Sequence, residues 1–212
     1  MINKNTKFID ISWPITKSTT QYKNKKEIDI IPTKTFENDK VRENLITLGS
    51  HSGTHIDFPA HFTKEGKNLS QTTEPFLIGI CQVLDLTNVN EKISKTDLEK
   101  FNIEENEIIL LKTKNSLLEF DSPFNPNFIY LEKSGAEFLA SKKPKAVGID
   151  YLGIERNQPN HGTHLTLLKK DILIIEGLRL SKVKISKYLL ICLPLLIPEI
   201  ESSPARAILI KR

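Results

Sequence analysis

The sequence predicts a mixed α/β fold in which strands outnumber helices. Short runs rich in isoleucine, valine and leucine recur between turn residues, and such runs favour strands. Helical signals are few, so a sheet-rich α/β domain is favoured over a regular alternation of strands and helices. The chain has 212 residues, 39% hydrophobic and 26% charged, and residues 1–212 are expected to form one globular domain.

The predicted strands are distributed along the whole chain. They cover residues 8–13, 28–36, 44–48, 79–86, 107–113, 146–149, 172–175, 188–193 and 205–210. Thr96 and the acidic turn that follows it predict a helix over 96–101, and apolar spacing predicts a second helix over 132–142. The proline-containing stretch 118–130 is expected to be a long surface loop.

The bulk composition argues against several classes of function. The net charge is +4, but the lysines are scattered, which argues against a nucleic-acid partner. The longest apolar stretch, 188–197, is too short to cross a membrane. Cys81 and Cys192 lie in apolar runs and are expected to be unreactive core thiols. Because neither a cysteine framework nor a signal peptide is evident, a cytoplasmic protein is expected.

The strongest functional signal is a set of polar residues at even spacing within 51–61. This segment reads His-Ser-Gly-Thr-His-Ile-Asp-Phe-Pro-Ala-His. An extended chain points every second side chain the same way, so one side of the segment is expected to present His51, His55, Asp57 and His61. The opposite side is then expected to be a hydrophobic anchor formed by Ile56, Phe58, Ala60 and Phe62.

The five histidines of the chain fall into two short clusters, and the second cluster holds His161 and His164. Imidazole and carboxylate ligands without thiolates suit Zn²⁺ or Mn²⁺. A catalytic metal site needs ligands from more than one segment, so the second cluster is expected to complete it. Glu176 ends the predicted strand 172–175, where a carboxylate needs a strong partner. The alternatives are an ordinary polar strand face and a water-exposed strand end.

Other polar residues leave alternatives open. His61 is expected to approach the metal without binding it, which suits an acid/base role near neutral pH, and the alternative is a further metal ligand. His161 lines the pocket or lies on an exposed turn. Asp150 orients a metal-bound histidine or simply ends its strand. Arg179 and Arg206 are expected at the surface.

Segment 51–61 resembles the His-x-Gly-Thr-His-x-Asp-x-Pro-x-His signature of the metal-dependent cyclase-like hydrolase family, which includes bacterial kynurenine formamidase and isatin hydrolase. The likeness covers nearly the whole chain, through residues 11–16, 146–150, 174–178, 193–195 and 203–206. Residues 150–153 depart from the formamidase pattern and are closer to the broader cyclase group. The resemblance implies the swivelling β/β/α domain of this family.

The resemblance also implies a binuclear site with two Zn²⁺ or Mn²⁺ ions per subunit. One ion is implied to be held by His51, His55 and Asp57. Asp57 and Glu176 are implied to bridge to a second ion, which His164 also binds. Relatives commonly form homodimers or homotetramers, so self-association is expected.

The resemblance gives two further residues a role in catalysis. His61 is implied to be the catalytic acid/base, and Tyr22 falls near a substrate-stacking tryptophan of formamidase relatives. The expected reaction is attack of metal-activated water on the carbonyl of a small amide, in the manner of kynurenine formamidase. The alternatives are hydrolysis of a cyclic lactam or lactone, in the manner of isatin hydrolase, and a catalytically silent metal-binding protein.

Overall fold

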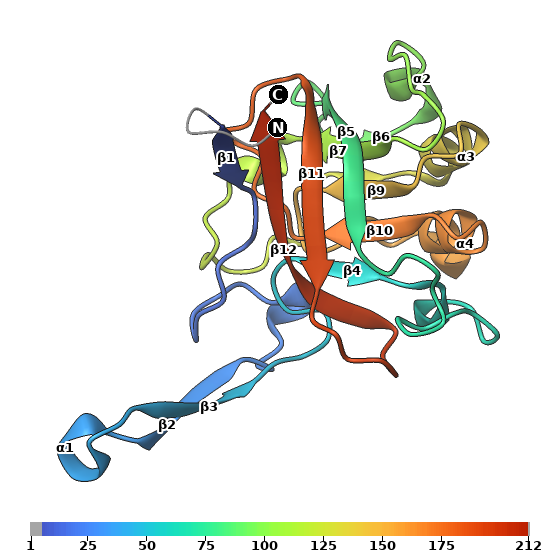
Figure 1. Cartoon of the computed structure of the whole chain (residues 1–212). Helices are drawn as coiled ribbons and strands as arrows, with labels where there is room; N and C mark the ends of the chain where they lie inside the picture. The colour runs from blue at the N-terminus through green and yellow to red at the C-terminus, as the bar shows by residue number, and fades with distance from the viewer. Residues whose placement is uncertain (1–5, 212) are drawn as a thin grey trace.

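A computed structural model, which describes residues 6–211, shows a chain built around one continuous sheet (Figure 1). The strand order is β1-β12-β11-β5-β7-β9-β10-β4, and β4 also pairs with β12. Seven strands therefore close into a barrel-like ring, and β1 extends the free edge of β12. The strands are β1 (Lys7–Asp10), β4 (His55–Asp57), β5 (Leu77–Asp85), β7 (Ile108–Lys112), β9 (Ala146–Ile149), β10 (Leu173–Glu176), β11 (Lys187–Pro194) and β12 (Ser202–Lys211).

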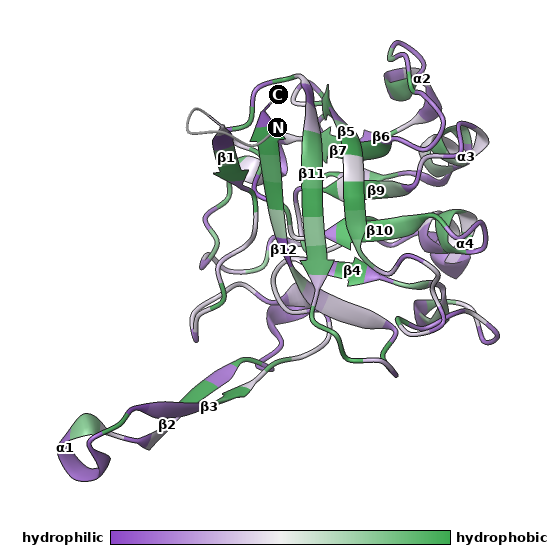
Figure 2. Ribbon diagram, viewed as in Figure 1, coloured by the Kyte–Doolittle hydropathy of each residue, from purple (hydrophilic) through white to green (hydrophobic). Residues whose placement is uncertain are grey.

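The strands β5, β7, β9 and β10 run parallel, and β7, β9 and β10 are buried on both faces. Ile108 and Leu110 of β7 belong to one hydrophobic core, which the strands of the ring share. Ile109 and Leu111 belong to a second core under the helices. Because successive side chains of a strand point to opposite faces, a strand buried on both faces needs a continuous apolar run. Figure 2 shows these strands as mainly hydrophobic.

Three helices stack along one side of the sheet (Figure 1). They are α2 (Lys95–Leu98), α3 (Lys133–Ser141) and α4 (Gly162–Leu168). Their apolar side chains, such as Leu139 and Leu167, pack into the second core. Helix α2 is capped by Ser94 and Asp97 in a capping box, so the predicted Thr96 cap was wrong by two residues. Within the described residues, no helix is long and apolar enough to cross a membrane.

A hairpin projects from the body of the molecule (Figure 1). It consists of β2 (Asp29–Lys34), the short tip helix α1 (Phe36–Asp39) and β3 (Glu43–Thr47). We call residues 29–47 the arm. Its side chains include large exposed apolar groups, which are Ile31, Phe36, Val41, Leu45 and Ile46. An isolated two-stranded hairpin is marginally stable in water, and the arm has hydrophobic stretches without a covering layer (Figure 2).

The predicted loop 118–130 is more ordered than expected. Its end enters β8 (Tyr130–Leu131), which pairs with β6 (Lys92–Ile93). Phe128 is buried in an aromatic cluster with Trp13 and Tyr151. The loop therefore contributes a third, smaller core beside the barrel.

The predicted strands agree with the structure except at a few ends. The strand predicted at 8–13 stops at Asp10, and Ser12 forms only an isolated bridge with Leu178. Segment 51–61 is extended only over His55–Asp57, and a 3-10 turn follows at Pro59–His61. A proline at the first position of that turn fixes its backbone, which ends the alternation of side chains.

Helix α4 was not predicted, because its sequence Gly-Thr-His is a poor helix start. Its first turn is held from another segment. The Glu155 carboxylate accepts the backbone N–H groups of Thr163 and His164 at 2.9 and 3.1 Å. Gly-Thr-His also occurs at residues 53–55, but the two stretches differ in backbone geometry, since Gly53 has φ +63° and Gly162 has φ −58°.

Candidate metal centre

The pairing of β4 with β10 brings the two predicted clusters together. The strands run antiparallel, with His55 opposite Glu176 and Ile56 opposite Ile175. Side chains directly opposite in such a pair lie on the same face of the sheet. The two isoleucines enter the barrel core, and His55 Nε2 lies 3.3 Å from Glu176 Oε2 on the other face.

The turn before β4 depends on close backbone contacts. Gly53 and Gly177 both have positive φ, and a Cβ atom on Gly177 would lie 2.3 Å from the Gly53 carbonyl oxygen. Thr54 Oγ1 donates to the Gly177 carbonyl at 2.5 Å and accepts the Trp13 N–H at 2.7 Å. These contacts fix the turn that carries His51 to the same face as His55.

Asp57 lies at the centre of the predicted ligands. Its side chain is fully buried, and Oδ1 lies 3.2 Å from His51 Nδ1 and 3.7 Å from His55 Nε2. On the other side, Oδ2 lies 3.9 Å from His164 Nε2. Glu176 closes the group, since its Oε1 lies 3.4 Å from the same His164 nitrogen. The structure thus brings all five predicted ligands into one cluster.

The cluster fits a divalent cation. Among the described residues, neither Asp57 oxygen nor His55 Nε2 has a hydrogen-bond partner, although all three atoms are buried. Buried polar groups are nearly always satisfied, so such atoms call for a ligand. Three imidazoles and two carboxylates without a thiolate form a donor set of the kind that Zn²⁺ or Mn²⁺ uses.

The second ring nitrogen of each histidine faces a protein oxygen. His51 Nε2 lies 3.1 Å from Glu201 Oε1, and His55 Nδ1 lies 2.9 Å from the Gly53 carbonyl. His164 Nδ1 lies 3.2 Å from Glu155 Oε2. Histidines that bind metals usually donate their outer N–H to such an oxygen. His51 and His55 form this hydrogen bond, whereas His164 meets Glu155 only as an ion pair. Glu155 and Glu201 were missed in the sequence, because they lie in loops and belong to no motif that the sequence displays.

Asp150 is not one of these partners. Its carboxylate accepts the N–H and the hydroxyl of Thr113, both at 2.7 Å, and the hydroxyl of Ser116 at 2.6 Å. Burial raises its pKa despite these hydrogen bonds. Of the two roles considered for Asp150, the structure supports the strand end, where this side chain organises the turn after β7.

Electrostatics in the cluster favour charged imidazoles when no cation is bound. Burial lowers the pKa of His51, but the Asp57 carboxylate at 3.2 Å and the Glu176 and Glu201 carboxylates outweigh it and raise the pKa to about 9. Burial is likewise outweighed at His164, where Glu155 and Glu176 raise the pKa to about 10. Burial disfavours the Glu176 carboxylate, yet the neighbouring histidines lower its pKa well below the usual value.

His61 lies beside the cluster on the 3-10 turn. Its ring centroid is 4.3 Å from that of His51 and 5.8 Å from that of His164. Burial lowers the pKa of His61, and the positive charges of His51 and His164 lower it further. The Asp57 carboxylate acts to raise it but is outweighed. His61 is therefore a neutral base at neutral pH, at the edge of the site.

The expectation that Phe62 faces away from the site was wrong. Ile56 and Phe58 are fully buried in the barrel core, as expected for the hydrophobic anchor. After Phe58 the 3-10 turn redirects the chain, and the Phe62 ring stacks on His164 with a centroid distance of 4.3 Å. Ala60 is only half-buried. Phe62 therefore forms part of the wall of the site.

A pocket of about 400 Å³ opens over the cluster. Its wall includes Tyr22, His61, Phe62, Leu152, Glu155 and His161. Tyr22 is half-buried and makes an edge contact with Phe124 at 5.0 Å between centroids. His161 lines this pocket, and its Nδ1 lies 3.0 Å from Glu155 Oε1. The pocket alternative for His161 is therefore supported, although its side chain remains largely open to solvent.

Arg206 and Arg179 lie in different environments. Arg206 pairs with Asp10 at the surface, as expected. Arg179 was also expected there, but it is half-buried, lies 4.9 Å from the Trp13 ring centroid and donates to the Leu118 carbonyl at 2.5 Å. It stabilises the aromatic cluster and is not in the pocket.

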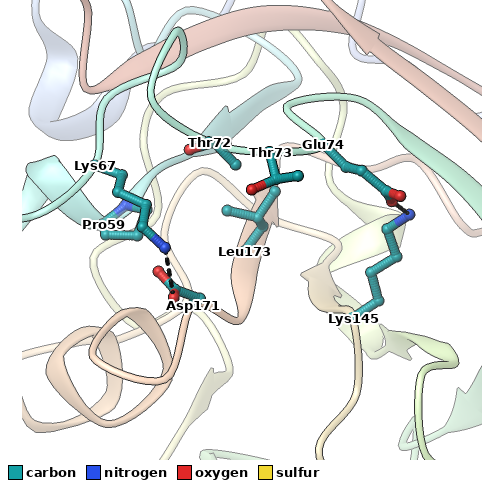
Figure 3. Close-up of a pocket in the computed structure, with 8 residues that line it drawn as sticks. All are labelled: Pro59, Lys67, Thr72, Thr73, Glu74, Lys145, Asp171 and Leu173. Carbon is teal, nitrogen blue, oxygen red and sulfur yellow. Dashed lines mark hydrogen bonds and ion pairs between the residues drawn. The ribbon is translucent and has the colours of Figure 1, made fainter.

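A second hollow of about 270 Å³ lies on another part of the surface (Figure 3). Its charged side chains pair with one another. Lys67 Nζ lies 2.9 Å from Asp171 Oδ2, and Lys145 pairs with Glu74. The wall holds no histidine or cysteine, so this hollow offers none of the chemistry of the histidine cluster.

The family model named Cyclase matches residues 9–156. The chain belongs to the cyclase family. It is 31% identical over 211 residues to the kynurenine formamidase of Bacillus thuringiensis, which covers 97% of this chain and 98% of the relative. The Bacillus anthracis kynurenine formamidase is also 31% identical, over 212 residues. The family recognised in segment 51–61 is thus confirmed, and its relatives are amide-cleaving hydrolases.

Solved structures of the cyclase family agree with this assignment. A chain described as a potential metal-dependent hydrolase with cyclase activity has a TM-score of 0.88 and 38% identity over 98% of both chains. A predicted metal-dependent hydrolase from Bacillus stearothermophilus has the same TM-score and identity, over 98% of this chain and 99% of that one. An isatin hydrolase has a TM-score of 0.83 and 20% identity, over 97% and 92% of the two chains, and shares the fold. The expected sheet-rich α/β fold is confirmed.

Proposed function

We propose that this protein is a metal-dependent hydrolase that cleaves a small aromatic N-formyl amide, in the manner of kynurenine formamidase. The observation that carries the proposal is the unpartnered Asp57 carboxylate, buried among histidines beneath a pocket with aromatic walls. The near full-length similarity to kynurenine formamidases supports the choice of substrate. The pocket volume of about 400 Å³ suits a small molecule.

The residues that would hold the metal are His51, His55, Asp57, His164 and Glu176. We propose Zn²⁺ or Mn²⁺ as the metal and two ions per subunit, for which Asp57 and Glu176 would supply the carboxylate ligands. Two carboxylates between opposing histidines support this arrangement. When bound, such ions polarise a carbonyl group and acidify water.

The protein's own side chains then have distinct tasks. His61 is neutral near pH 7, so its imidazole is able to take a proton from the attacking water and pass it to the leaving nitrogen. Tyr22 and Phe62 offer ring faces and edges for an aromatic substrate. Phe62 also covers His164 and excludes water from that side of the site.

The test is a panel of substrates with the Zn²⁺- or Mn²⁺-loaded protein. N-formylkynurenine and formanilides are expected to be hydrolysed faster than isatin or simple lactones. Preferential cleavage of the cyclic compounds would favour the lactam alternative, whose structural support is the shared fold of isatin hydrolase. Absence of turnover across the whole panel would favour a silent metal-binding protein.

The His61→Ala variant tests the proposed acid/base residue. Loss of a positioned proton donor and acceptor is expected to lower kcat by about 10²- to 10⁴-fold, while the bound metal is retained. The measurements are steady-state kinetics and metal content on the same sample. Loss of the metal together with activity would instead indicate that His61 is a ligand.

We also propose that the protein is a cytoplasmic homodimer or homotetramer. The arm supports self-association, because it carries exposed apolar side chains on both strands and none of the described residues 6–211 covers them. The two buried free thiols, Cys81 and Cys192, suit a reducing compartment. No nucleic-acid or membrane partner is proposed.

A further inference from the structure

We propose that Glu201 is a positioning residue that fixes the tautomer and orientation in which His51 binds a divalent cation. The inference rests on the proposed metal site and adds a residue outside its ligand set. It is carried by the contacts of Glu201, its place in the fold and the unusual exposure of His51 among the histidine ligands.

Backbone pairing places Glu201 beside the cluster. The residue directly precedes β12, whose first residue Ser202 pairs with Asp57. The Phe58 N–H donates to the Glu201 carbonyl at 2.9 Å. The main chain at Glu201 is thus fixed against the same strand that carries His55 and Asp57, so its side chain reaches the site from a rigid base.

The Glu201 carboxylate is oriented by two neighbouring groups. Ser50 Oγ donates to Glu201 Oε1 at 2.8 Å, and His51 Nε2 lies 3.1 Å from the same oxygen. Two contacts from adjacent residues thus hold one carboxylate oxygen beside His51. A charged acceptor held in this way forms a stronger hydrogen bond than a mobile one.

The two nitrogens of His51 face different partners. Nδ1 lies 3.2 Å from Asp57 Oδ1, and Nε2 faces Glu201. A neutral imidazole carries a hydrogen on one nitrogen and a lone pair on the other. Donation of the Nε2 hydrogen to Glu201 leaves the Nδ1 lone pair directed toward Asp57, where the cation is proposed to bind.

His51 depends on this contact more than the other histidine ligands depend on theirs. Its side chain is 27% exposed, compared with 1% for His55 and 9% for His164. Packing therefore holds the His51 ring least firmly. His51 is also carried by a turn, whereas His55 lies in a strand and His164 in a helix. A hydrogen bond to the outer nitrogen compensates for the weaker packing.

The experiment measures zinc affinity of the full chain by competition with a chromophoric chelator. Removal of the acceptor in Glu201→Ala is expected to weaken zinc binding by about 10- to 100-fold. Glu201→Gln keeps an oxygen acceptor and is expected to lose less zinc affinity than Glu201→Ala. The matched control is Glu199→Ala, an exposed acidic residue on the same loop, which is expected to bind zinc as the wild type does.

Thermal unfolding of the metal-free variants separates positioning from a structural role. All three variants are expected to keep the Tm of the metal-free wild type, since Glu201 is substantially exposed. Wild-type zinc affinity in Glu201→Ala would overturn the inference, as would equal losses in the alanine and glutamine variants. Zinc binding by the wild type without formamide hydrolysis would end the proposed function and leave the positioning role intact.

Discussion

Asp57 shows how a single side chain organises the site. Its two oxygens face histidines from β4 and its preceding turn on one side and from α4 on the other. Burial and the neighbouring Glu176 carboxylate act to raise the pKa of Asp57, but His51 at 3.2 Å and His55 outweigh them and lower it. In the metal-free protein, protonated histidines therefore take the place of a cation as counter-charges.

Because protonated histidines replace the cation as counter-charges, the stability of the metal-free protein is expected to depend on pH. In the folded protein the pKa values of His51 and His164 are about 9 and 10, above the ordinary 6.5. Their contribution to the free energy of unfolding is therefore complete below pH 6.5 and is lost as the pH rises toward 10. Glu176 has a lowered pKa, so its contribution is present above the ordinary 4.5 and is lost as pH falls. Metal-free protein is expected to be most stable between about pH 5 and 6.5.

The measurement is thermal unfolding in a chelator across the pH range. With saturating zinc the optimum is expected to move upward, because a cation requires imidazoles without protons. A metal-free profile that is flat between pH 6 and 10 would contradict the role given to the two histidines. The same scan on Glu199→Gln controls for general surface charge.

At the scale of elements, the interior strands of the sheet were predicted well because each is an apolar run that is buried on both faces. The parallel strands β7, β9 and β10 lie within a residue or two of their predicted limits. Helix α4 was missed, since its first turn is stabilised by Glu155 from another segment. The redirection of Phe62 was missed for a similar reason, because the turn after Phe58 breaks the period of two.

The arm carries the exposed apolar side chains on which the proposed self-association rests. Ile31 and Leu45 form a cross-strand pair, and both are about half exposed. Leu45→Lys is expected to shift the protein toward monomer, because it places a charge on a surface proposed to be covered. The measurement is molar mass by light scattering after size-exclusion chromatography.

The matched control for this variant is Thr33→Lys, at an exposed polar position of the same arm. It is expected to keep the wild-type mass. An unchanged mass in Leu45→Lys would contradict the proposed role of the arm, and a wild-type monomer would remove the proposal of self-association. Circular dichroism checks that the body remains folded in both variants.

At the scale of the whole molecule, the closure of the sheet decides which residues meet. His55 and Glu176 are far apart in sequence, yet they lie opposite each other because β10 enters the ring next to β4. Local sequence patterns do not encode strand order, so the spacing of residues alone did not predict that His55 and Glu176 lie opposite each other. The resemblance of segment 51–61 to a known family implied that Glu176 belongs to the same metal site as His55. No motif in the sequence indicated a role for Glu155 or Glu201.

Metal removal is expected to lower the stability of the whole chain, because the ligands join β4, β10, α4 and a turn. A cation at 100 times its Kd stabilises the folded state by about 2.7 kcal/mol. For a chain of this size, that corresponds to a rise in Tm of about 5 to 10 °C. Calorimetry with chelator and then with added zinc measures the difference. An equal Tm in both conditions would show that these ligands do not hold a metal.

The strand β4 is only three residues long, yet it is paired along both edges, to β10 and to β12. Its amide hydrogens should therefore exchange with deuterium as slowly as those of the longest strands. The pocket wall, in contrast, is formed partly by short turns with left-handed backbone positions, at residues 22–24 and around His161. Because Tyr22 and His161 line the pocket, changes in those turns are expected to alter which molecules enter it while the proposed metal ligands stay in place.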